Sequence, residues 1–312
     1  MKRHLRRWPV IFLAMLCAML SSCALASDGE KATRGDDSGS RSSQSEASAE
    51  DAASDSSLPA DFAALQEADA QVGTIAEGQL RDTVFALVSS AENSTTDYAA
   101  EYGYIEDIDD GRGYTCGLIG FTTATGDALD VVRLYVALAP DDNPLAPYVP
   151  ALEAAVGSDT HDGLGDGFVA AWKKAARTAE MKRAQDAIID ERYLLPAVAD
   201  ARTDGLSPLG QYIYYDALVV HGPGDDPDSF GGIRAAALAR CQPPSAGGDE
   251  AAYLNAFLDA RTIVMQKEAA HSDLSRINVQ RAFVEEGNYD LRRPLVWEMY
   301  GDEFSLQTSQ AV

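Results

Sequence analysis

The chain has 312 residues, of which 46% are hydrophobic and 8% are aromatic, so it can bury a substantial core and is not a disordered chain. This length allows one large domain or two small ones. The formal net charge at pH 7 is −24. Such a charge argues against a nucleic-acid-binding protein, because phosphate binding requires clustered lysine and arginine residues.

Most of the negative charge belongs to the part of the chain after residue 59. Residues 1–59 contain seven lysine and arginine residues and eight acidic residues, which leaves a net charge of −23 for residues 60–312. A surface with this charge attracts a cationic polymer and raises its local concentration. The alternative is that the acidity serves only solubility.

The first 22 residues have the organisation of an export signal. Four basic residues lie between positions 2 and 7, and the mostly apolar stretch that follows is too short to span a bilayer comfortably. Residues 20–23 (LSSC) match a lipobox, the bacterial signal for attaching a lipid to a cysteine, here Cys23, and for cleaving the chain just before it. The alternative is ordinary cleavage after the small residues at 24–26 (ALA). Both interpretations predict an extracellular protein, and the lipobox adds a lipid anchor on the outer face of the cell membrane.

Residues 23–57 are predicted to be a flexible linker. The segment is rich in Ser, Asp, Glu, Gly and Ala, and from residue 27 onward it contains no Val, Ile, Leu or aromatic residue. A segment of this composition cannot bury a core. The folded domain is therefore predicted to occupy residues 58–312.

Hydrophobic periodicity within this domain predicts mainly helices. Leu80, Val84, Leu87 and Val88 recur at helical spacing and predict an amphipathic helix over 77–91. Residues 102–125 are rich in Tyr, Ile, Gly and Thr and carry turn signals, which predicts short strands and loops. Further helices are predicted over 128–138, 168–179, 181–193, 209–220, 250–270 and 275–286. The expected fold class is α+β, mostly helical with one small early sheet, in an arrangement that can form two lobes.

Cys116 and Cys241 are the cysteines outside the signal region. Export would permit a disulfide between them, and two free, buried thiols are the alternative. Neither has the spacing of metal ligands, so no metal site is predicted.

Two acidic residues occupy positions suited to the hydrolysis of a glycosidic bond. That reaction needs one protonated carboxyl group to assist the leaving oxygen and one ionised carboxylate on the opposite side of the bond. Glu92 ends an apolar helix, where burial favours the protonated form, and Asp110 lies in a glycine-flanked loop open to water, where it stays ionised. In a chain with 49 acidic residues, the alternative interpretation is a pair of solvated surface acids.

Nine motifs surround and follow these two residues in order. They are SSAENS at 89–94, YIEDI at 104–108, DGRGYT at 110–115, IGF at 119–121, TGD at 125–127, YYDA at 214–217, HGPG at 221–224, SFGGIR at 229–234 and FLDAR at 257–261. The motifs closely resemble those of the glycoside hydrolase family 46 chitosanases, over nearly the whole globular part. The resemblance implies a two-lobed, lysozyme-like fold with a small antiparallel sheet in the smaller lobe and a substrate cleft between the lobes.

The resemblance also implies roles for individual residues around the reaction. Glu92 corresponds to the acid, Asp110 to the base, and Thr115 to a hydroxyl residue that helps to hold the attacking water. A buried charge network that supports the acid corresponds to Asp216, Arg261 and Arg276. The alternative for these three residues is a set of purely structural ion pairs.

Six further residues match positions that contact the substrate in the family. Asp127 matches a residue that binds a substrate amine, and the other cleft positions are Tyr104, Arg112, Tyr193, His221 and Glu268. Without the resemblance, the two tyrosines would be interpreted as core aromatics, and the histidine as a residue that fixes the following loop. The chain departs from the family pattern at Ser272, where an acid is expected, so an amine contact at one subsite is weakened or supplied by Asp273.

The sequence therefore predicts an endo-chitosanase that inverts the configuration at the β-1,4 linkages between glucosamine units, with chitosan and chito-oligosaccharides as its partners. It is expected to act as a monomer, to need no cofactor, and to meet the membrane only through its lipid anchor. One alternative is a lysozyme-like peptidoglycan hydrolase, although a domain with a charge of −23 would repel that anionic polymer. The other is a non-catalytic lipoprotein that binds cationic oligosaccharides.

Overall fold

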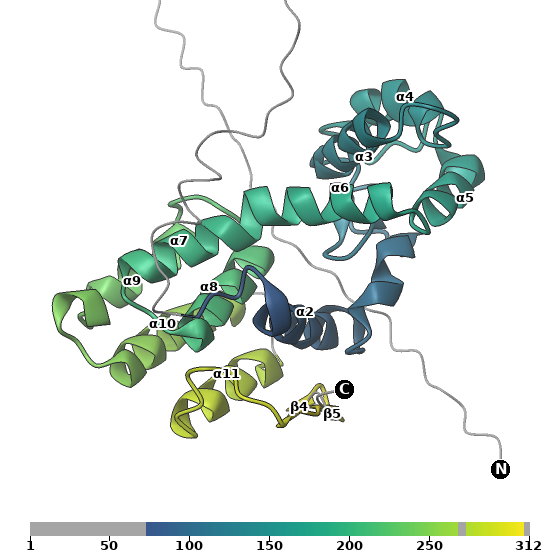
Figure 1. Cartoon of the computed structure of the whole chain (residues 1–312). Coiled ribbons are helices and arrows are strands. Elements are labelled where there is room, and N and C mark those ends of the chain that lie inside the picture. The colour runs from purple at the N-terminus through teal and green to yellow at the C-terminus, as the bar shows by residue number, and fades with distance from the viewer. Residues whose placement is uncertain (1–72, 268–272, 309–312) are drawn as a thin grey trace, which may run out of the picture. The chain divides into compact units, whose positions relative to one another are not determined.

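The computed structural model describes residues 73–267 and 273–308 (Figure 1). The predicted signal peptide over 1–22, the lipidation residue Cys23 and the predicted linker over 23–57 lie outside these residues. So does the predicted cleft residue Glu268. The predictions made for these positions, and for a domain start at residue 58, stay predictions.

The described residues form helices joined by short loops and two small sheets. The α-helices are α2 (Gly78–Asn93), α3 (Asp127–Leu138), α4 (Val149–Ala155), α5 (Gly165–Ala175), α6 (Ala179–Ile189), α7 (Leu195–Thr203), α8 (Pro208–His221), α9 (Phe230–Leu238), α10 (Glu250–Met265) and α11 (Ser275–Glu285). Short helical turns are η1 (Tyr98–Gly103), η2 (Ala146–Tyr148), the π-helical η3 (Asp190–Leu194) and η4 (Pro244–Ala246). The strands are β1 (Ile105–Asp107), β2 (Tyr114–Cys116), β3 (Phe121–Thr122), β4 (Leu295–Met299) and β5 (Asp302–Leu306).

The smaller lobe combines the first sheet with α3, α4, α5 and the beginning of α6. Strands β1, β2 and β3 are antiparallel neighbours in that order, and their register aligns Ile105 with Cys116 and Cys116 with Phe121. All three side chains are buried, so one row across the sheet faces the core. Helix α5 packs against β1, and α3 packs against α6. This sheet confirms the prediction of short strands within residues 102–125.

One long helical segment joins the smaller lobe to the larger lobe. It runs from α6 through η3 into α7 without a break in the helical assignment, and α3, α4 and α5 lie at its α6 end while α8, α9 and α10 lie beside its α7 end (Figure 1). Arg81 connects this segment to α2, the helix that also contains Glu92, since Arg81 Nη1 lies 2.5 Å from Asp190 Oδ1.

The larger lobe is built around α8. Every residue of this helix is buried except Val219, as expected for a helix that is apolar on all sides. Ser207 begins it by accepting a hydrogen bond from the backbone N–H of Gly210, and Pro208 occupies its first position. Helices α7, α9, α11 and α2 pack around α8, and α10 packs against α9 and α11.

A C-terminal hairpin that the sequence did not predict completes the larger lobe. Leu295, Trp297 and Met299 alternate with exposed residues along β4, so one face of the hairpin is buried. The indole Nε1–H of Trp297 donates to Ser90 Oγ at 2.9 Å, which fastens the hairpin to α2. Helices α4, α7 and α9 were also not predicted.

The mostly helical α+β fold with a small antiparallel sheet in the smaller lobe is thus confirmed. The prediction left the state of the cysteines open; in the structure Cys116 and Cys241 are both free, and Cys116 is buried. None of the helices within residues 73–267 and 273–308 has the length and apolar character needed to cross a bilayer.

Candidate functional site

Glu92 lies in the last turn of α2, two residues after a stretch of eight consecutive buried residues that runs from Thr83 to Ser90. Its side chain is 13% exposed, and its Oε1 lies 2.6 Å from Nη1 of Arg276 on α11. The left-handed conformation of Ser94, with φ 52°, ends the helix immediately beyond it. The carboxyl group is therefore largely covered and held in one orientation by a single guanidinium group.

Asp216 on α8 contacts the same Arg276 and accepts three side-chain hydrogen bonds in all. It accepts hydrogen bonds at 2.7 Å from Arg276 Nε on Oδ1, and from Arg261 Nη1 and Gln280 Nε2 on Oδ2. Asp216 and Arg261 are fully buried. Burial by itself would raise the pKa of Asp216, but the two guanidinium groups outweigh it and hold the pKa below the ordinary value. Asp216 is accordingly an ionised carboxylate inside the protein.

His221 belongs to the same network. Arg261 Nε donates to His221 Nε2 at 3.1 Å, so this ring nitrogen is an acceptor and carries no proton. Only 3% of His221 is exposed. Gly222, with φ 69°, ends α8 directly after it and turns the chain into the loop that precedes α9. The structure therefore connects His221 to Asp216 and Glu92 through Arg261 and Arg276.

Asp110 lies in the turn between β1 and β2 on the smaller lobe. The backbone N–H of Arg112 donates to its Oδ1 at 3.0 Å, and Arg112 Nε donates to its Oδ2 at 2.8 Å. The Arg112 Nη2 group forms a further contact to the same oxygen. Only 7% of the Asp110 side chain is exposed, so the expectation of a side chain open to water is wrong. The turn itself is exposed at Gly111, but the carboxylate is held against the neighbouring arginine.

Thr115 is the central residue of β2 and pairs with Glu106 on β1 and Thr122 on β3. It is fully buried, and its hydroxyl oxygen makes no hydrogen bond within the described residues. A buried hydroxyl without a protein partner is unusual, because such groups normally find one. This hydroxyl group can therefore bind a further polar molecule.

Asp127 is the first residue of α3. Its Oδ1 accepts hydrogen bonds from the backbone N–H groups of Thr122 and Ala128, at 2.7 and 2.8 Å, and from Thr125 Oγ1 at 2.6 Å. Burial raises the pKa of Asp127, and these hydrogen bonds oppose the rise. All three bonds end on one oxygen, so Oδ2 keeps its lone pairs for another donor. Tyr193 lies close enough for the charge of Asp127 to contribute to its pKa, which burial chiefly raises to about 12.

Tyr104 follows η1 at the start of the sheet. Its hydroxyl group donates to Glu106 Oε2 at 3.4 Å, and its backbone carbonyl accepts from Gly117 N at 2.8 Å. Burial, followed by the charge of Glu106, raises its pKa to about 12. Tyr104 is partly exposed. This exposure is compatible with both interpretations, a core aromatic and a residue that lines the cleft.

The predicted residues thus fall into two groups on different lobes. The larger lobe brings together Glu92, Asp216, Arg261, Arg276 and His221, whereas the smaller lobe and its junction with η3 carry Asp110, Arg112, Thr115, Asp127, Tyr104 and Tyr193. The two candidate carboxyl groups therefore come from opposite lobes.

Two residues of this site were missed from the sequence. Gln280 completes the coordination of Asp216. Tyr300, in the turn between β4 and β5, lies near the acid: burial raises its pKa, Arg276 opposes the rise and Glu92 adds to it. Tyr300 is 44% exposed and has a left-handed φ of 54°, which is uncommon for a residue with a bulky side chain. The sequence signal that could have pointed to Tyr300 was its place beside Gly301 in a short turn.

Comparison with known proteins agrees with this arrangement. The model of glycosyl hydrolase family 46 matches residues 86–295. A chitosanase of Streptomyces sp. (strain N174) is 52% identical over 229 residues, which cover 73% of this chain and 82% of that protein.

Solved structures give the same result. The co-crystal structure of chitosanase OU01 with substrate has 57% sequence identity and a TM-score of 0.72, and the match covers 75% of this chain and 100% of that one. A complex of a Gynuella sunshinyii family 46 chitosanase with chitotetraose has 34% identity and a TM-score of 0.68, and covers 75% of this chain and 99% of that one.

Proposed function

Because the chain belongs to glycosyl hydrolase family 46, we propose that it is an endo-acting chitosanase that hydrolyses β-1,4 linkages between glucosamine units with inversion of configuration. The observation that carries the proposal is the pair of restrained carboxyl groups on opposite lobes. Glu92 is held by Arg276, and Asp110 is held by Arg112. Hydrolysis with inversion uses one such group on each side of the scissile bond.

In the proposed reaction Glu92 is the general acid. It transfers its proton to the glycosidic oxygen as the bond to the anomeric carbon breaks, and it is left as a carboxylate. Arg276, whose Nη1 lies 2.6 Å from Glu92 Oε1, holds the carboxyl group in one orientation. Asp216 also binds Arg276 and keeps the guanidinium group in place. Arg276 and Asp216 are therefore positioning residues, and they do not touch the reacting atoms.

Asp110 is the proposed general base. It removes a proton from a water molecule as the oxygen of that water attacks the anomeric carbon from the face opposite the leaving oxygen. Arg112 donates hydrogen bonds to both carboxylate oxygens and holds Asp110 in one orientation. The hydroxyl group of Thr115, which pairs with Glu106 across the sheet and has no hydrogen-bond partner among the described residues, is proposed to hold the water.

Substrate selection is proposed to depend on negative charge. Chitosan carries protonated amines, and residues 60–312 carry a net charge of −23, so the polymer is attracted before it binds. Asp127 supports a specific contact, because its Oδ2 accepts no hydrogen bond from the described residues. We propose that this oxygen binds a glucosamine amine, beside Tyr193. Glu268, which lies outside the described residues, is proposed from the sequence as a further contact.

The decisive experiment measures reducing-sugar release from chitosan, chitin and peptidoglycan. We expect release from chitosan; release from peptidoglycan alone would indicate a lysozyme-like hydrolase, and release from none of the three would indicate a binding protein. Glu92→Gln and Asp110→Asn should each lower kcat on chitosan by about 10²- to 10⁴-fold. Asp259→Asn, on the exposed side of α10, is the matched control and should leave kcat unchanged.

Stereochemistry tests the two roles separately from activity. With Asp110 as the base, proton NMR of the first products should show the α-anomer before mutarotation. Initial release of the β-anomer would mean that a covalent intermediate forms, and Asp110 would then not be the residue that activates water.

We further propose that the protein is exported and that Cys23 carries a lipid anchor. The support is sequence alone: a basic and apolar start followed by LSSC at residues 20–23. Cys23→Ala should release the enzyme into the medium or leave the precursor unprocessed, as measured by fractionation and by mass spectrometry of the N-terminus. A fully soluble wild-type protein that begins at Ser27 would contradict the anchor and leave export intact.

A further inference from the structure

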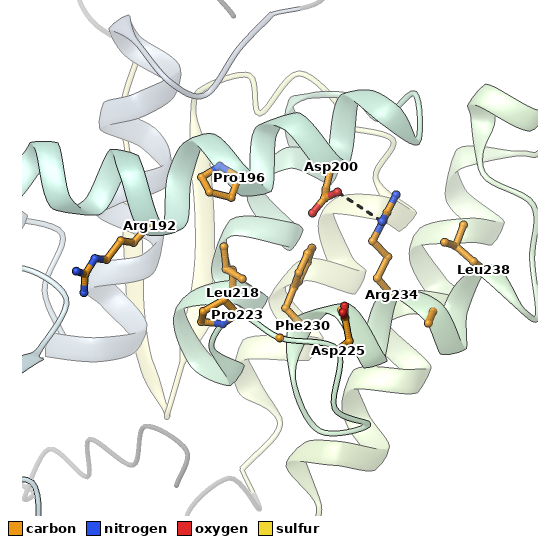
Figure 2. A pocket seen from close by; sticks show the side chains of 12 residues that line it. Arg192, Pro196, Asp200, Leu218, Pro223, Asp225, Phe230, Arg234 and Leu238 are labelled. Atoms are coloured by element: carbon orange, nitrogen blue, oxygen red, sulfur yellow. Dashed lines mark ion pairs between the residues drawn. The ribbon is translucent and has the colours of Figure 1, made fainter. Parts of the chain in front are cut away.

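A pocket of about 430 Å³ lies on the larger lobe, where α7 faces the end of α8, the loop that follows it and α9 (Figure 2). Its wall includes Arg192, which directly precedes Tyr193, and Pro223, two residues after His221. Arg192 is also ion-paired to α3, the helix that begins with Asp127. Arg192 therefore links the wall of the pocket to this helix.

The two cations of the pocket wall are compensated by carboxylates outside it. Arg234 donates two hydrogen bonds to Asp204, from Nε at 2.7 Å and from Nη2 at 2.8 Å. Asp204 is almost fully buried behind the wall. Arg192 is paired with Asp130 on α3. Neither guanidinium group therefore leaves an uncompensated positive charge in the pocket.

Two carboxylates of the wall keep most of their negative charge available. Asp200 on α7 is 41% exposed, and its contact is the 3.4 Å approach of Arg234 Nη1 to its Oδ1, which Figure 2 shows. Asp225, in the loop before α9, is exposed, and no basic side chain of the described chain lies within ion-pair distance of it. Burial is the main cause of a raised pKa at Asp200; Arg234 opposes the rise, and Asp204 and Asp225 add to it.

The remaining wall is apolar. Leu218 and Phe230 are buried and form its inner part, whereas Pro196, Pro223 and Leu238 are exposed. An apolar surface with a few convergent polar groups is the usual composition of a small-molecule site. It suits a pyranose ring, which presents C–H groups on its faces and polar groups at its edge. A ligand that combines such a ring with a positive charge matches both parts of this wall.

We propose that this pocket is an outer subsite for a glucosamine unit of the polymer, whose protonated amine is bound by Asp200 and Asp225. This inference rests on the proposed function. Asp200 lies eight residues beyond Arg192, about 12 Å along the helix axis at 1.5 Å per residue. Only a substrate that extends well past Asp127 reaches the pocket, so it contributes to the binding of long chains and not to that of short oligosaccharides.

Asp225→Asn tests the proposal most sharply, because Asp225 has no ion pair to lose and lies in an exposed loop. KM and kcat would be measured on long-chain chitosan and on glucosamine trimers and tetramers. We expect KM for the polymer to rise about 3- to 10-fold, the range expected for one carboxylate–ammonium contact. The kcat on polymer, and both constants on short substrates, should stay unchanged. Adding Asp200→Asn should raise KM for the polymer further.

Asp259→Asn is the matched control, since it removes one exposed negative charge from α10, where Asp259 is paired with Arg281. The subsite would be overturned if Asp259→Asn raised KM for the polymer as much as Asp225→Asn does. It would also be overturned if Asp225→Asn raised KM equally on short substrates, or did not raise KM for the polymer. Failure of the wild-type protein to hydrolyse chitosan would overturn the proposed function and the subsite with it. An active wild type with an unaffected Asp225→Asn variant would overturn the subsite alone.

Discussion

Replacing Asp216 by asparagine removes one negative charge from the centre of the network while keeping the shape of the side chain. The wild-type carboxylate accepts hydrogen bonds from Arg276, Arg261 and Gln280, each at 2.7 Å. Asparagine offers one carbonyl oxygen and one NH2 group, so at least one of these donors would face another donor. Two guanidinium groups with side-chain exposures of 0% and 6% would also lose the carboxylate that both of them bind.

Breaking one partner of a buried ion pair costs about 3–5 kcal/mol of folding free energy. For a folded region of this size, each kcal/mol lowers Tm by about 2–4 °C, so the Asp216→Asn variant should melt about 6–20 °C below the wild type. The control is Asp259→Asn. That residue is also paired with an arginine, Arg281 at 2.5 Å, but its side chain is 61% exposed, and exposed pairs contribute about 0–1 kcal/mol.

The assay is thermal and urea unfolding of both variants at pH 7, repeated down to pH 3. Because the pKa of Asp216 is lowered in the folded state, the stability that it contributes is fully present above the unfolded value of about 3.9 and is lost as the pH falls through the folded value. The Asp216→Asn variant should therefore show a shallower loss of stability in acid than the wild type. A destabilisation at pH 7 no larger than that of Asp259→Asn would refute this account of the network.

Three further outcomes are expected. Asp127→Asn should raise KM for chitosan with little change in kcat. In the wild type, KM should begin to rise at a higher pH than it would with an ordinary aspartate, because burial raises the pKa of Asp127. A KM profile from pH 7 to 4 checks this. Trp297→Phe should cost about 0.5–1.5 kcal/mol in urea unfolding, because it removes one hydrogen bond to the buried Ser90 hydroxyl group, which still donates to the carbonyl of Leu87; a loss of the same size in a Ser90→Ala background would contradict this. Gly232→Ala should lower Tm, because its Cβ would lie 2.0 Å from the backbone oxygen of Asp226, whereas Gly287→Ala meets no atom within 4 Å and carries only the strain of its φ of 67°.

The central helix of the larger lobe was predictable because its signals are local. Residues 209–220 are apolar on all sides, Ser207 and Pro208 begin the helix, and Gly222 ends it. The C-terminal hairpin has no such signal. Its two five-residue strands depend on a contact between Trp297 and Ser90, which are separated by 207 positions in the chain, and a contact of that range leaves no trace in a local pattern.

The candidate site likewise contains residues that could be predicted from the sequence and features that could not. Glu92 and Asp110 stand within motifs that could be recognised in the sequence, and so does Arg112, which binds Asp110 from two positions away. What the sequence could not give is how far each carboxyl group is covered. Asp110 was expected in water, yet its side chain is nearly buried because the arginine folds back over it. Gln280 was missed because a glutamine on a helix is usually a solvated residue, and only tertiary packing brings it to Asp216.

The π-helical turn η3 lets α6 and α7 present different faces to their neighbours than a uniform α-helix through both would. A π-turn contains one residue more than an α-turn, so it changes which side of α7 faces α8 without changing which side of α6 faces α3. If Asp190–Leu194 were wound as an ordinary α-helix with no residue removed, every position after it would rotate by about 100° around the axis. Ala197, Val198 and Ala201 would then turn away from the interior of the lobe that they now help to fill. The length of one turn, rather than the chemistry of any side chain, thus sets the alignment of everything that follows it.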